Sequence, residues 1–251
     1  MKFLGVIPAR YHSTRFPGKP LCLIGGKPMI QRVYEQVAQV KEFQEVIVAT
    51  DDKRIWQVVT DFGGKALMTA SSHRSGTERC AEVYTKYKEI YTEHDTYVVN
   101  IQGDEPFIQV KQIQELIQYV SDTKIEIATL LHPIKEEAVL CNPNVVKAII
   151  TKQQKLLYFS RTAIPYLQKK SFFQHCFYKH IGLYVYKAST LMSLVALPPS
   201  SLEEAENLEQ LRWLEHGYTM GACITNCESS VAIDTPEDLA VANNLYAKNH
   251  F

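Results

Sequence analysis

Short apolar runs alternate with longer stretches of helical periodicity through the first half of the chain. The runs predict strands over 3–7, 45–49, 66–69 and 96–101. Apolar residues at three- and four-residue spacing predict helices over 29–40, 51–62, 76–91 and 110–120. This alternation is typical of repeated strand-helix-strand units, so we expect a mostly parallel, Rossmann-like sheet flanked by helices.

The regular alternation breaks in the middle of the chain. Strands are predicted over 125–131, 145–151 and 156–160 with no long helix between them. Residues from about 132 to 186 therefore predict a β-rich subdomain inserted into a core of about 1–131 and 187–251, and exposed apolar residues there could form a dimer interface. A helix over 202–215, a strand over 219–225 and a helix over 236–248 complete the pattern.

Composition narrows the classes of protein that this pattern can describe. The 251 residues carry 27 Lys+Arg and 27 Asp+Glu, a net charge of zero that argues against a nucleic-acid binder and against a disordered chain. No apolar run approaches the roughly 20 residues that cross a bilayer, and the first residues do not form a secretory signal. We expect a soluble, cytoplasmic protein without membrane insertion, whose six cysteines are reduced thiols because none forms a C-x-x-C pair.

Three cations lie close together in the loop after the first predicted strand. Arg10, Arg15 and Lys19 share ten residues with two hydroxyl side chains, and Gly18 permits close approach of the backbone. Arginine forks and a lysine point charge suit a polyphosphate better than a single carboxylate. The loop is not a Walker A motif, because Pro20 follows the lysine and disfavours an immediate helix. A solvated basic loop is the alternative.

Two carboxylates follow the most apolar predicted strand. Asp104 and Glu105 come shortly after the strand over 96–101, at the edge where open parallel sheets bind ligands. Pro106 keeps Glu105 extended, so the two side chains should diverge and serve different tasks. Mg²⁺ takes one or two protein carboxylates together with substrate phosphates, which makes Asp104 a candidate ligand. Alternatively, Asp104 caps the turn.

A further carboxylate precedes the last predicted helix. Thr235 as N-cap, Pro236 at the first helical position and Asp238 at the third make a complete helix start. Asp234 is not needed for this capping, which makes it a candidate for a second metal carboxylate. Its alternative role is to complement the helix dipole.

Two other polar patterns have structural explanations. Ser75 and Glu78 fit a capping box at the start of the helix over 76–91. Glu206, Gln210 and Trp213 recur on one side of the predicted helix over 202–215, opposite its leucines, and this stripe could face solvent or substrate.

The motifs in their order along the chain resemble the CMP-KDO synthetase (3-deoxy-manno-octulosonate cytidylyltransferase) family, and the resemblance covers essentially the whole sequence. The strings that carry it are Ile7-Pro8-Ala9-Arg10-Tyr11, Ser13-Thr14-Arg15-Phe16-Pro17-Gly18-Lys19-Pro20, His73-Arg74-Ser75-Gly76-Thr77-Glu78-Arg79, Asn100-Ile101-Gln102-Gly103-Asp104-Glu105-Pro106, Asn142-Pro143-Asn144-Val145-Val146-Lys147, Tyr158-Phe159-Ser160-Arg161, Ile164-Pro165, Lys179-His180-Ile181-Gly182-Leu183-Tyr184, Leu208-Glu209-Gln210-Leu211-Arg212 and Asp234-Thr235-Pro236-Glu237-Asp238-Leu239.

The resemblance implies a fold of the nucleotide-diphospho-sugar transferase type, a homodimer, and a defined reaction. In that reaction the anomeric hydroxyl of 3-deoxy-D-manno-octulosonate (KDO) attacks the α-phosphate of CTP, giving CMP-KDO and pyrophosphate for lipopolysaccharide biosynthesis. Such displacement depends on positioning and electrostatic stabilisation, which a cationic loop and Mg²⁺ can supply. Alternatives are a cytidylyltransferase for 8-amino-KDO or sialic acid, and a non-catalytic nucleotide-sugar binding protein.

The resemblance also implies roles for individual residues. The CTP-binding residues would be Ala9, Arg10, Ser13, Arg15, Lys19, Arg74, Ser75 and Gln102, with the last three near the cytosine. The sugar acid would be held by Arg161, His180, Tyr184, Glu209 and Gln210. The catalytic residues would be Arg10, Lys19, Asp104 and Asp234, of which the two aspartates would bind Mg²⁺.

Overall fold

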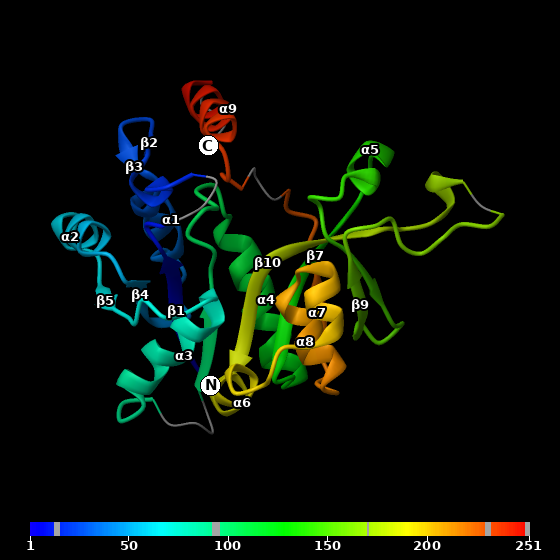
Figure 1. Ribbon diagram of the computed structural model, residues 1–251, viewed down its shortest axis with the longest axis horizontal. Helices are drawn as coiled ribbons and strands as arrows, with labels where there is room; N and C mark the ends of the chain where they lie inside the picture. The colour runs from blue at the N-terminus through cyan, green and yellow to red at the C-terminus, as the bar shows by residue number, and fades with distance from the viewer. Residues whose placement is uncertain (13–15, 92–95, 170, 229–231, 249–251) are drawn as a thin grey trace.

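A computed structural model describes residues 1–12, 16–91, 96–169, 171–228 and 232–248. Its central feature is a mostly parallel sheet with helices on both faces (Figure 1), which confirms the expected α/β fold. The sheet order is β11-β7-β10-β6-β1-β4-β5, with β8 paired to β10 and β9 to β8. The strands are β1 (Lys2–Ala9), β4 (Phe43–Thr50), β5 (Ala66–Met68), β6 (Thr96–Asn100), β7 (Ile127–Pro133), β8 (Lys147–Ile150), β9 (Leu156–Ser160), β10 (Tyr178–Lys187) and β11 (Gly221–Ile224).

Helices connect the strands, and a small hairpin precedes the first of them. The hairpin consists of β2 (Leu23–Ile24) and β3 (Lys27–Pro28), and the short 3₁₀ helices are η1 (Lys19–Leu21) and η2 (Phe172–Gln174). The α-helices are α1 (Met29–Val37), α2 (Lys53–Asp61), α3 (Gly76–Tyr87), α4 (Val110–Thr123), α5 (Glu137–Cys141), α6 (Ala188–Val195), α7 (Ser201–Glu206), α8 (Glu209–Glu215) and α9 (Pro236–Ala247). Among the described residues, none of these helices has the length and apolar character needed to span a membrane.

Strand β1 lies at the centre of the sheet and is buried on both faces. Its alternate side chains enter two hydrophobic clusters, because successive residues of a strand point to opposite faces. Phe3 and Ile7 pack with apolar residues of α1, α2 and α4. Leu4 and Val6 pack with those of α3, α6 and α8. This double coverage explains why the strand has a continuous apolar sequence and not an alternating one.

The position of β10 changes the expected division of the chain. Its first residues, Tyr178 and Lys179, pair with β8, whereas its second half, from Tyr184 to Lys187, runs antiparallel beside β6 in the middle of the main sheet. The boundary expected at residue 186 therefore falls inside a strand that belongs to both parts. Residues 178–187 were expected only as part of the β-rich subdomain and not as a separate strand, and pairing with β6 makes them part of the main sheet as well. Helix α6 follows this strand directly and was not among the expected helices.

The prediction of a single helix over 202–215 is wrong, because the chain forms two helices there. Helix α7 ends at Asn207, which adopts a left-handed conformation with φ of 51°, and α8 starts two residues later. The break rotates α8 relative to α7, so the expected polar stripe does not exist. Gln210 and Trp213 are buried, with exposed fractions of 6% and 1%.

Candidate active site

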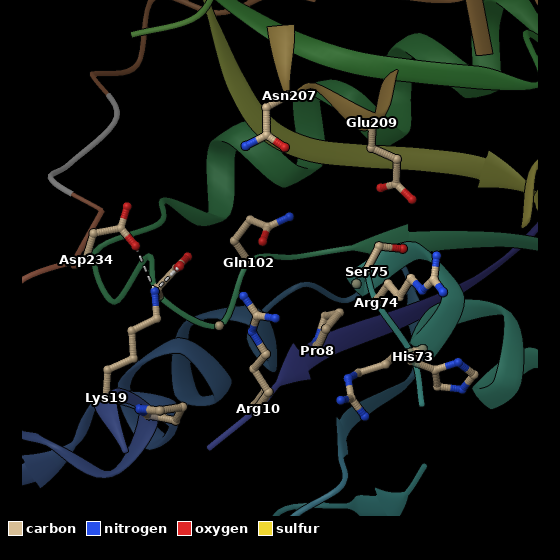
Figure 2. Close-up of a pocket in the computed structure, with 16 residues that line it drawn as sticks. Pro8, Arg10, Lys19, His73, Arg74, Ser75, Gln102, Asn207, Glu209 and Asp234 are labelled. Atoms are coloured by element: carbon tan, nitrogen blue, oxygen red, sulfur yellow. Dashed lines mark hydrogen bonds and ion pairs between the residues drawn. The ribbon is translucent and has the colours of Figure 1, made fainter. Parts of the chain in front are cut away.

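A cavity of about 540 Å³ lies at the carboxyl ends of β1 and β6. Parallel strands bring the loops that follow them to one edge of the sheet, which is where such folds bind ligands. One wall comes from the loop after β1 and the start of α3, and the opposite wall comes from the junction of α7 and α8 (Figure 2). The residues lining the cavity are Pro8, Ala9, Arg10, Lys19, Pro20, His73, Arg74, Ser75, Gly76, Arg79, Gln102, Gly103, Asp104, Asn207, Glu209 and Asp234.

Three charged side chains from distant parts of the sequence meet in this cavity, and we call them the Lys19 cluster. The ammonium of Lys19 donates to Oδ2 of Asp104 at 2.6 Å and to Oδ1 of Asp234 at 3.0 Å. It also donates to the carbonyl oxygen of Ile233 at 3.2 Å. Burial by itself would lower the pKa of Lys19, but the two carboxylates outweigh it and the pKa is raised. Lysine 19 is therefore a charged, paired group with only 13% of its side chain exposed, not a solvated surface cation.

Local backbone geometry brings Lys19 into the cavity. Gly18 has a φ of 72°, a left-handed conformation that other residues adopt only at a cost, and its amide donates to the carbonyl of Tyr11 at 2.8 Å. The Tyr11 ring lies under the Arg54 guanidinium, 3.3 Å from the ring centroid, and Arg54 pairs with Asp52. Helix α2 thus anchors the loop. Arg10 lines the cavity as expected, whereas the predicted ligands Ser13 and Arg15 lie outside the described residues.

The two adjacent carboxylates after β6 diverge, as the following proline predicted. Asp104 faces Lys19, whereas Glu105 is not among the residues lining the cavity. The pKa of Glu105 is raised to about 8, mainly by burial and in second place by the neighbouring carboxylate of Asp104. The positive charge of Lys179 lowers this pKa and offsets part of the effect. The loop packs tightly against β1, because a Cβ on Gly103 would lie 2.7 Å from the carbonyl oxygen of Pro8. This close approach fixes where Asp104 enters the cavity.

Asp234 is held in place by apolar packing before α9. Ile233 is fully buried in a small cluster with Ile24, Met29 and Ala242, which fastens this segment to the hairpin and α1. The amide of Ile233 donates to the carbonyl of Asp104 at 3.0 Å, so the two loops are directly joined. The helix start is complete without Asp234, because the Asp238 amide donates to the Thr235 hydroxyl and its carboxylate accepts from two backbone amides, including that of Asp234.

The segment before α3 forms the side of the cavity next to Pro8. Ser75 caps the helix by accepting from the Glu78 amide at 3.2 Å, which confirms the predicted capping role. The same residue lines the cavity together with Arg74 and Gln102. Gln102 is anchored by a bond from its side-chain nitrogen to the carbonyl of Gly182 at 3.1 Å. The residues expected around the nucleobase thus lie in one cavity.

Several lining residues were not predicted. Arg79 is 4% exposed and is held by Asp51 at 2.8 Å and by Thr69 at 2.6 Å, so it supports the cavity floor from inside α3. The helix expected to begin at 51–52 does so with Asp52 as its N-cap, and Asp51 pairs with Arg79. Asn207 enters the cavity because α7 ends there, and its only sequence signal is the tendency of asparagine to adopt the left-handed conformation.

Of the five residues expected to hold a sugar acid, only Glu209 lines the cavity. Its carboxylate accepts from the Thr77 hydroxyl at 2.7 Å, and burial raises its pKa despite that bond and a second one from Ser75. His180 does not line the cavity; it is bonded to the Thr129 hydroxyl at 2.9 Å, and burial lowers its pKa to about 3.

The remaining three residues also lie away from the lining. Tyr184 is buried against Tyr186 and Trp213, and Gln210 is buried in α8. The guanidinium of Arg161 donates to the backbone carbonyls of Glu206, Pro143 and Asn207.

Comparison with known proteins identifies the family. A family model described as Cytidylyltransferase matches residues 4–224, so the chain belongs to the cytidylyltransferase family. It is 52% identical to the 3-deoxy-manno-octulosonate cytidylyltransferase of Parabacteroides distasonis, over 96% of this chain and 97% of that protein. The protein of the same name from Thermodesulfovibrio yellowstonii is 49% identical, over 94% and 95%. The resemblance inferred from the sequence motifs is thereby confirmed.

Solved structures agree with this assignment. The structure of CMP:2-keto-3-deoxy-manno-octonic acid synthetase complexed with CTP has a TM-score of 0.91 and 41% identity, with 99% of each chain covered. A cytidylyltransferase from Leptospira borgpetersenii has a TM-score of 0.65 at 16% identity, covering 99% of this chain and 87% of that one. The second likeness concerns the fold alone.

Proposed function

We propose that this protein transfers the cytidylyl group of CTP to KDO, giving CMP-KDO and pyrophosphate. The anomeric hydroxyl oxygen of the sugar forms a bond to the α-phosphorus, and the bond from that phosphorus to the bridging oxygen of pyrophosphate breaks. The observation that carries this proposal is the Lys19 cluster, which places a cation and two carboxylates in one cavity beside Arg10. In-line displacement at phosphorus needs such charges more than it needs a nucleophilic side chain.

Arg10 and Lys19 are the groups that would bind the triphosphate. Both side chains line the cavity. A guanidinium binds phosphate oxygens through two parallel bonds, whereas an ammonium supplies a point charge. Ser13 and Arg15, expected beside them from the resemblance, remain predictions.

Asp104 and Asp234 would hold Mg²⁺. Their donor set fits this ion, because two carboxylate oxygens that both contact one ammonium converge on a single position, and Mg²⁺ prefers oxygen ligands completed by substrate phosphates. When bound, Mg²⁺ would neutralise charge on the phosphates as the leaving group departs. The two carboxylates would orient the ion, and Lys19 would be free to contact the phosphates.

The sugar acid and the cytosine would contact different walls of the cavity, which meet where Glu209 accepts from Ser75. Arg74, Ser75 and Gln102 surround the part next to α3, where we place the base. Glu209 and Asn207 face Gln102 from the opposite wall (Figure 2), and we place the sugar hydroxyls there because carboxylate and amide oxygens accept their hydrogen bonds.

Pyrophosphate release tests the proposal. The protein is incubated with CTP and Mg²⁺ and with KDO, 8-amino-KDO, N-acetylneuraminate or no acceptor, and CMP-KDO formation is followed in parallel. We expect release with KDO that depends on Mg²⁺ and exceeds release with the other acids. Faster release with another acid would change the acceptor, and no release with any acid would contradict an enzymatic function.

We also propose a cytoplasmic homodimer. Tyr166 and Leu157 are 88% and 57% exposed on the segment that includes β9, and burying such apolar surface favours association. Light scattering after size exclusion should give twice the mass of the chain. Tyr166→Lys should weaken the dimer, whereas an unchanged mass of this variant at all concentrations would place the interface elsewhere.

A further inference from the structure

Lys19 and Asp234 reach the cavity from two small elements that are far apart in the sequence. Lys19 begins η1, which leads through Cys22 into the β2–β3 hairpin, and the Met29 amide closes this hairpin by donating to the Cys22 carbonyl at 2.8 Å. Asp234 directly precedes the N-cap of α9, and its amide donates to the Asp238 carboxylate at 3.0 Å. Lys19 is thus attached to the hairpin, and Asp234 is attached to α9.

Helix α9 has little apolar surface with which to hold its position. It lies beside the hairpin (Figure 1), and all of its residues are described. Ala242 is the one buried residue of this helix, with Leu239 and Tyr246 partly buried in the same small cluster. Because a methyl group contributes far less to a packed contact than a large side chain does, polar and aromatic contacts supply much of what fixes α9 on the hairpin.

The side chain of Asn243 joins α9 to the hairpin through both of its polar atoms. Its Oδ1 accepts from the Gly25 amide at 3.0 Å, and its Nδ2 donates to the Leu23 carbonyl at 3.2 Å. The same Nδ2 donates to the Leu239 carbonyl, one turn earlier in α9, at 3.1 Å. This last bond holds the side chain against its own helix, so the two bonds to the hairpin restrain the helix as well as the side chain.

The ring of Tyr246 packs directly on the turn of the hairpin. Gly25 has a φ of 52°, and a Cβ at this position would lie 2.1 Å from Cε1 of the ring, so glycine allows the two to meet. The Arg32 guanidinium lies over the same ring, 4.1 Å from its centroid, and donates to the Gly25 carbonyl at 2.9 Å. We call the contacts of Asn243 and Tyr246 with Leu23, Gly25 and Arg32 the α9 contact.

The α9 contact can affect the cavity only through the positions of the two elements. Its five residues are all described, and none of them lines the cavity. The bond from the Ile233 amide to the Asp104 carbonyl fixes the segment before α9 at one point. One point leaves the direction of the segment open, and the α9 contact supplies the second point. If this contact were lost, Asp234 would move relative to Lys19, whereas Asp104 would stay with β6.

We propose that Asn243 and Tyr246 are positioning residues, which hold the Asp234 carboxylate opposite Lys19 by fixing α9 on the hairpin. This inference rests on the proposed function, in which Asp234 and Asp104 share one Mg²⁺. That ion demands near-ideal octahedral geometry, so a small displacement of one carboxylate weakens binding. The last helix of the chain thereby takes part in building the metal site, although its own side chains lie outside the cavity.

Metal affinity measured without turnover gives the first test. The Kd for Mn²⁺ in the absence of CTP is measured by electron paramagnetic resonance for the wild type, Asn243→Ala, Tyr246→Leu and Asn244→Ala. The matched control is Asn244→Ala, because Asn244 is the next residue of the same helix and is exposed. We expect a Kd raised about fivefold in Asn243→Ala and in Tyr246→Leu, and unchanged in the control. An unchanged Kd in both variants of the α9 contact would overturn the inference.

Steady-state kinetics separate positioning from a merely structural role. We expect kcat to fall about fivefold in Asn243→Ala, with the KM for KDO changed less than about twofold, because the wall formed by Asn207 and Glu209 does not touch the α9 contact. A rise in this KM at unchanged kcat would contradict the inference. So would a lower unfolding midpoint in urea with unchanged kcat and Mn²⁺ affinity, since α9 would then contribute stability alone. If Asn243→Ala does not fold, Tyr246→Leu carries the comparison.

A double-mutant cycle with Asp234→Asn identifies the residue through which Asn243 acts. Once Asp234 is already asparagine, Asn243→Ala should change the Mn²⁺ affinity less than about twofold, because the two effects are not independent. Full additivity in this cycle would show that Asn243 does not act through Asp234. Failure of the proposed function would appear separately, as a wild type that binds Mn²⁺ but releases no pyrophosphate with KDO, and the Mn²⁺ cycle would still decide the role of Asn243.

Discussion

The Lys19 cluster and a second network, formed by Lys147, Arg161 and Glu206, both place cations against oxygen atoms, but the oxygens differ. We call the second network the Asn207 support, because it lies at the end of α7 beside Asn207. In the cluster, the ammonium contacts two carboxylates that are 26% and 38% exposed at the cavity surface. In the support, fully buried Lys147 and partly buried Arg161 bond to backbone carbonyls. Carboxylates at a cavity surface can exchange one cation for another, whereas a fully buried side chain such as Lys147 keeps its carbonyl partners. We infer that the first region performs chemistry and the second maintains geometry.

Neutralising a carboxylate of the cluster should have the largest effect. We expect Asp104→Asn to lower kcat about 100-fold or more, because electrostatic stabilisers of a transition state are typically worth about 3 kcal/mol. Its unfolding midpoint in urea should stay near that of the wild type, since Lys19 keeps Asp234. The matched control is Asp61→Asn on the exposed end of α2, with unchanged kcat. A rate close to wild type in Asp104→Asn would remove this residue from the catalytic site.

Removing the buried ammonium of Lys147 should lower the stability of the fold, which Asp104→Asn leaves near that of the wild type. Lys147→Met leaves three carbonyls without their shared donor, so we expect a loss of about 2 kcal/mol in the free energy of unfolding. Urea denaturation measures it, with Lys152→Met as the exposed control. The comparison fails if Lys147→Met is as stable as its control, or if Asp104→Asn is the less stable of the two variants.

The pH dependence of stability tests the buried surroundings of the support. His180 lies beside Phe159 of β9, and its folded pKa of about 3 is below the usual value of 6.5. Its contribution is thus fully present above pH 6.5 and is lost as the pH falls toward 3. Between pH 6 and 5 the wild type should lose about 1.2 kcal/mol of stability more than His180→Gln. Parallel stability curves for the two proteins would show that His180 is protonated in the fold.

The smallest expected effect concerns exchange of cations in the cluster. Lys19→Met removes the ammonium that competes for both carboxylates, so Mn²⁺ used as a probe should bind about fivefold more tightly in the absence of CTP, a change of about 1 kcal/mol. Electron paramagnetic resonance of free Mn²⁺ measures this affinity without turnover. The control is Lys27→Met, which breaks a pair with Glu35 outside the cavity. Equal Mn²⁺ affinity in Lys19→Met and the wild type would show that the Lys19 ammonium and the metal ion do not compete for the two carboxylates.

Local signals in the sequence predicted much of this site. Three charged groups stand out in the sequence, namely the loop with Lys19 and the carboxylates Asp104 and Asp234. Each lies next to an apolar segment that could form its strand or helix without that charge. The structure places all three within hydrogen-bonding distance. Apolar periodicity likewise predicted the alternating strands and helices of the first half, since burial on both faces of a parallel sheet leaves a strong pattern.

Patterns in the sequence were enough to predict the type of fold, the family and the charged groups of the cavity. They did not predict that β10 enters the middle of the sheet, that a helix breaks at Asn207, or that Arg161 faces carbonyls. The difference is one of distance along the chain. Strand periodicity and helix capping depend on neighbours in the sequence, whereas the choice between a carbonyl and a cavity depends on residues far along the chain that only folding brings together.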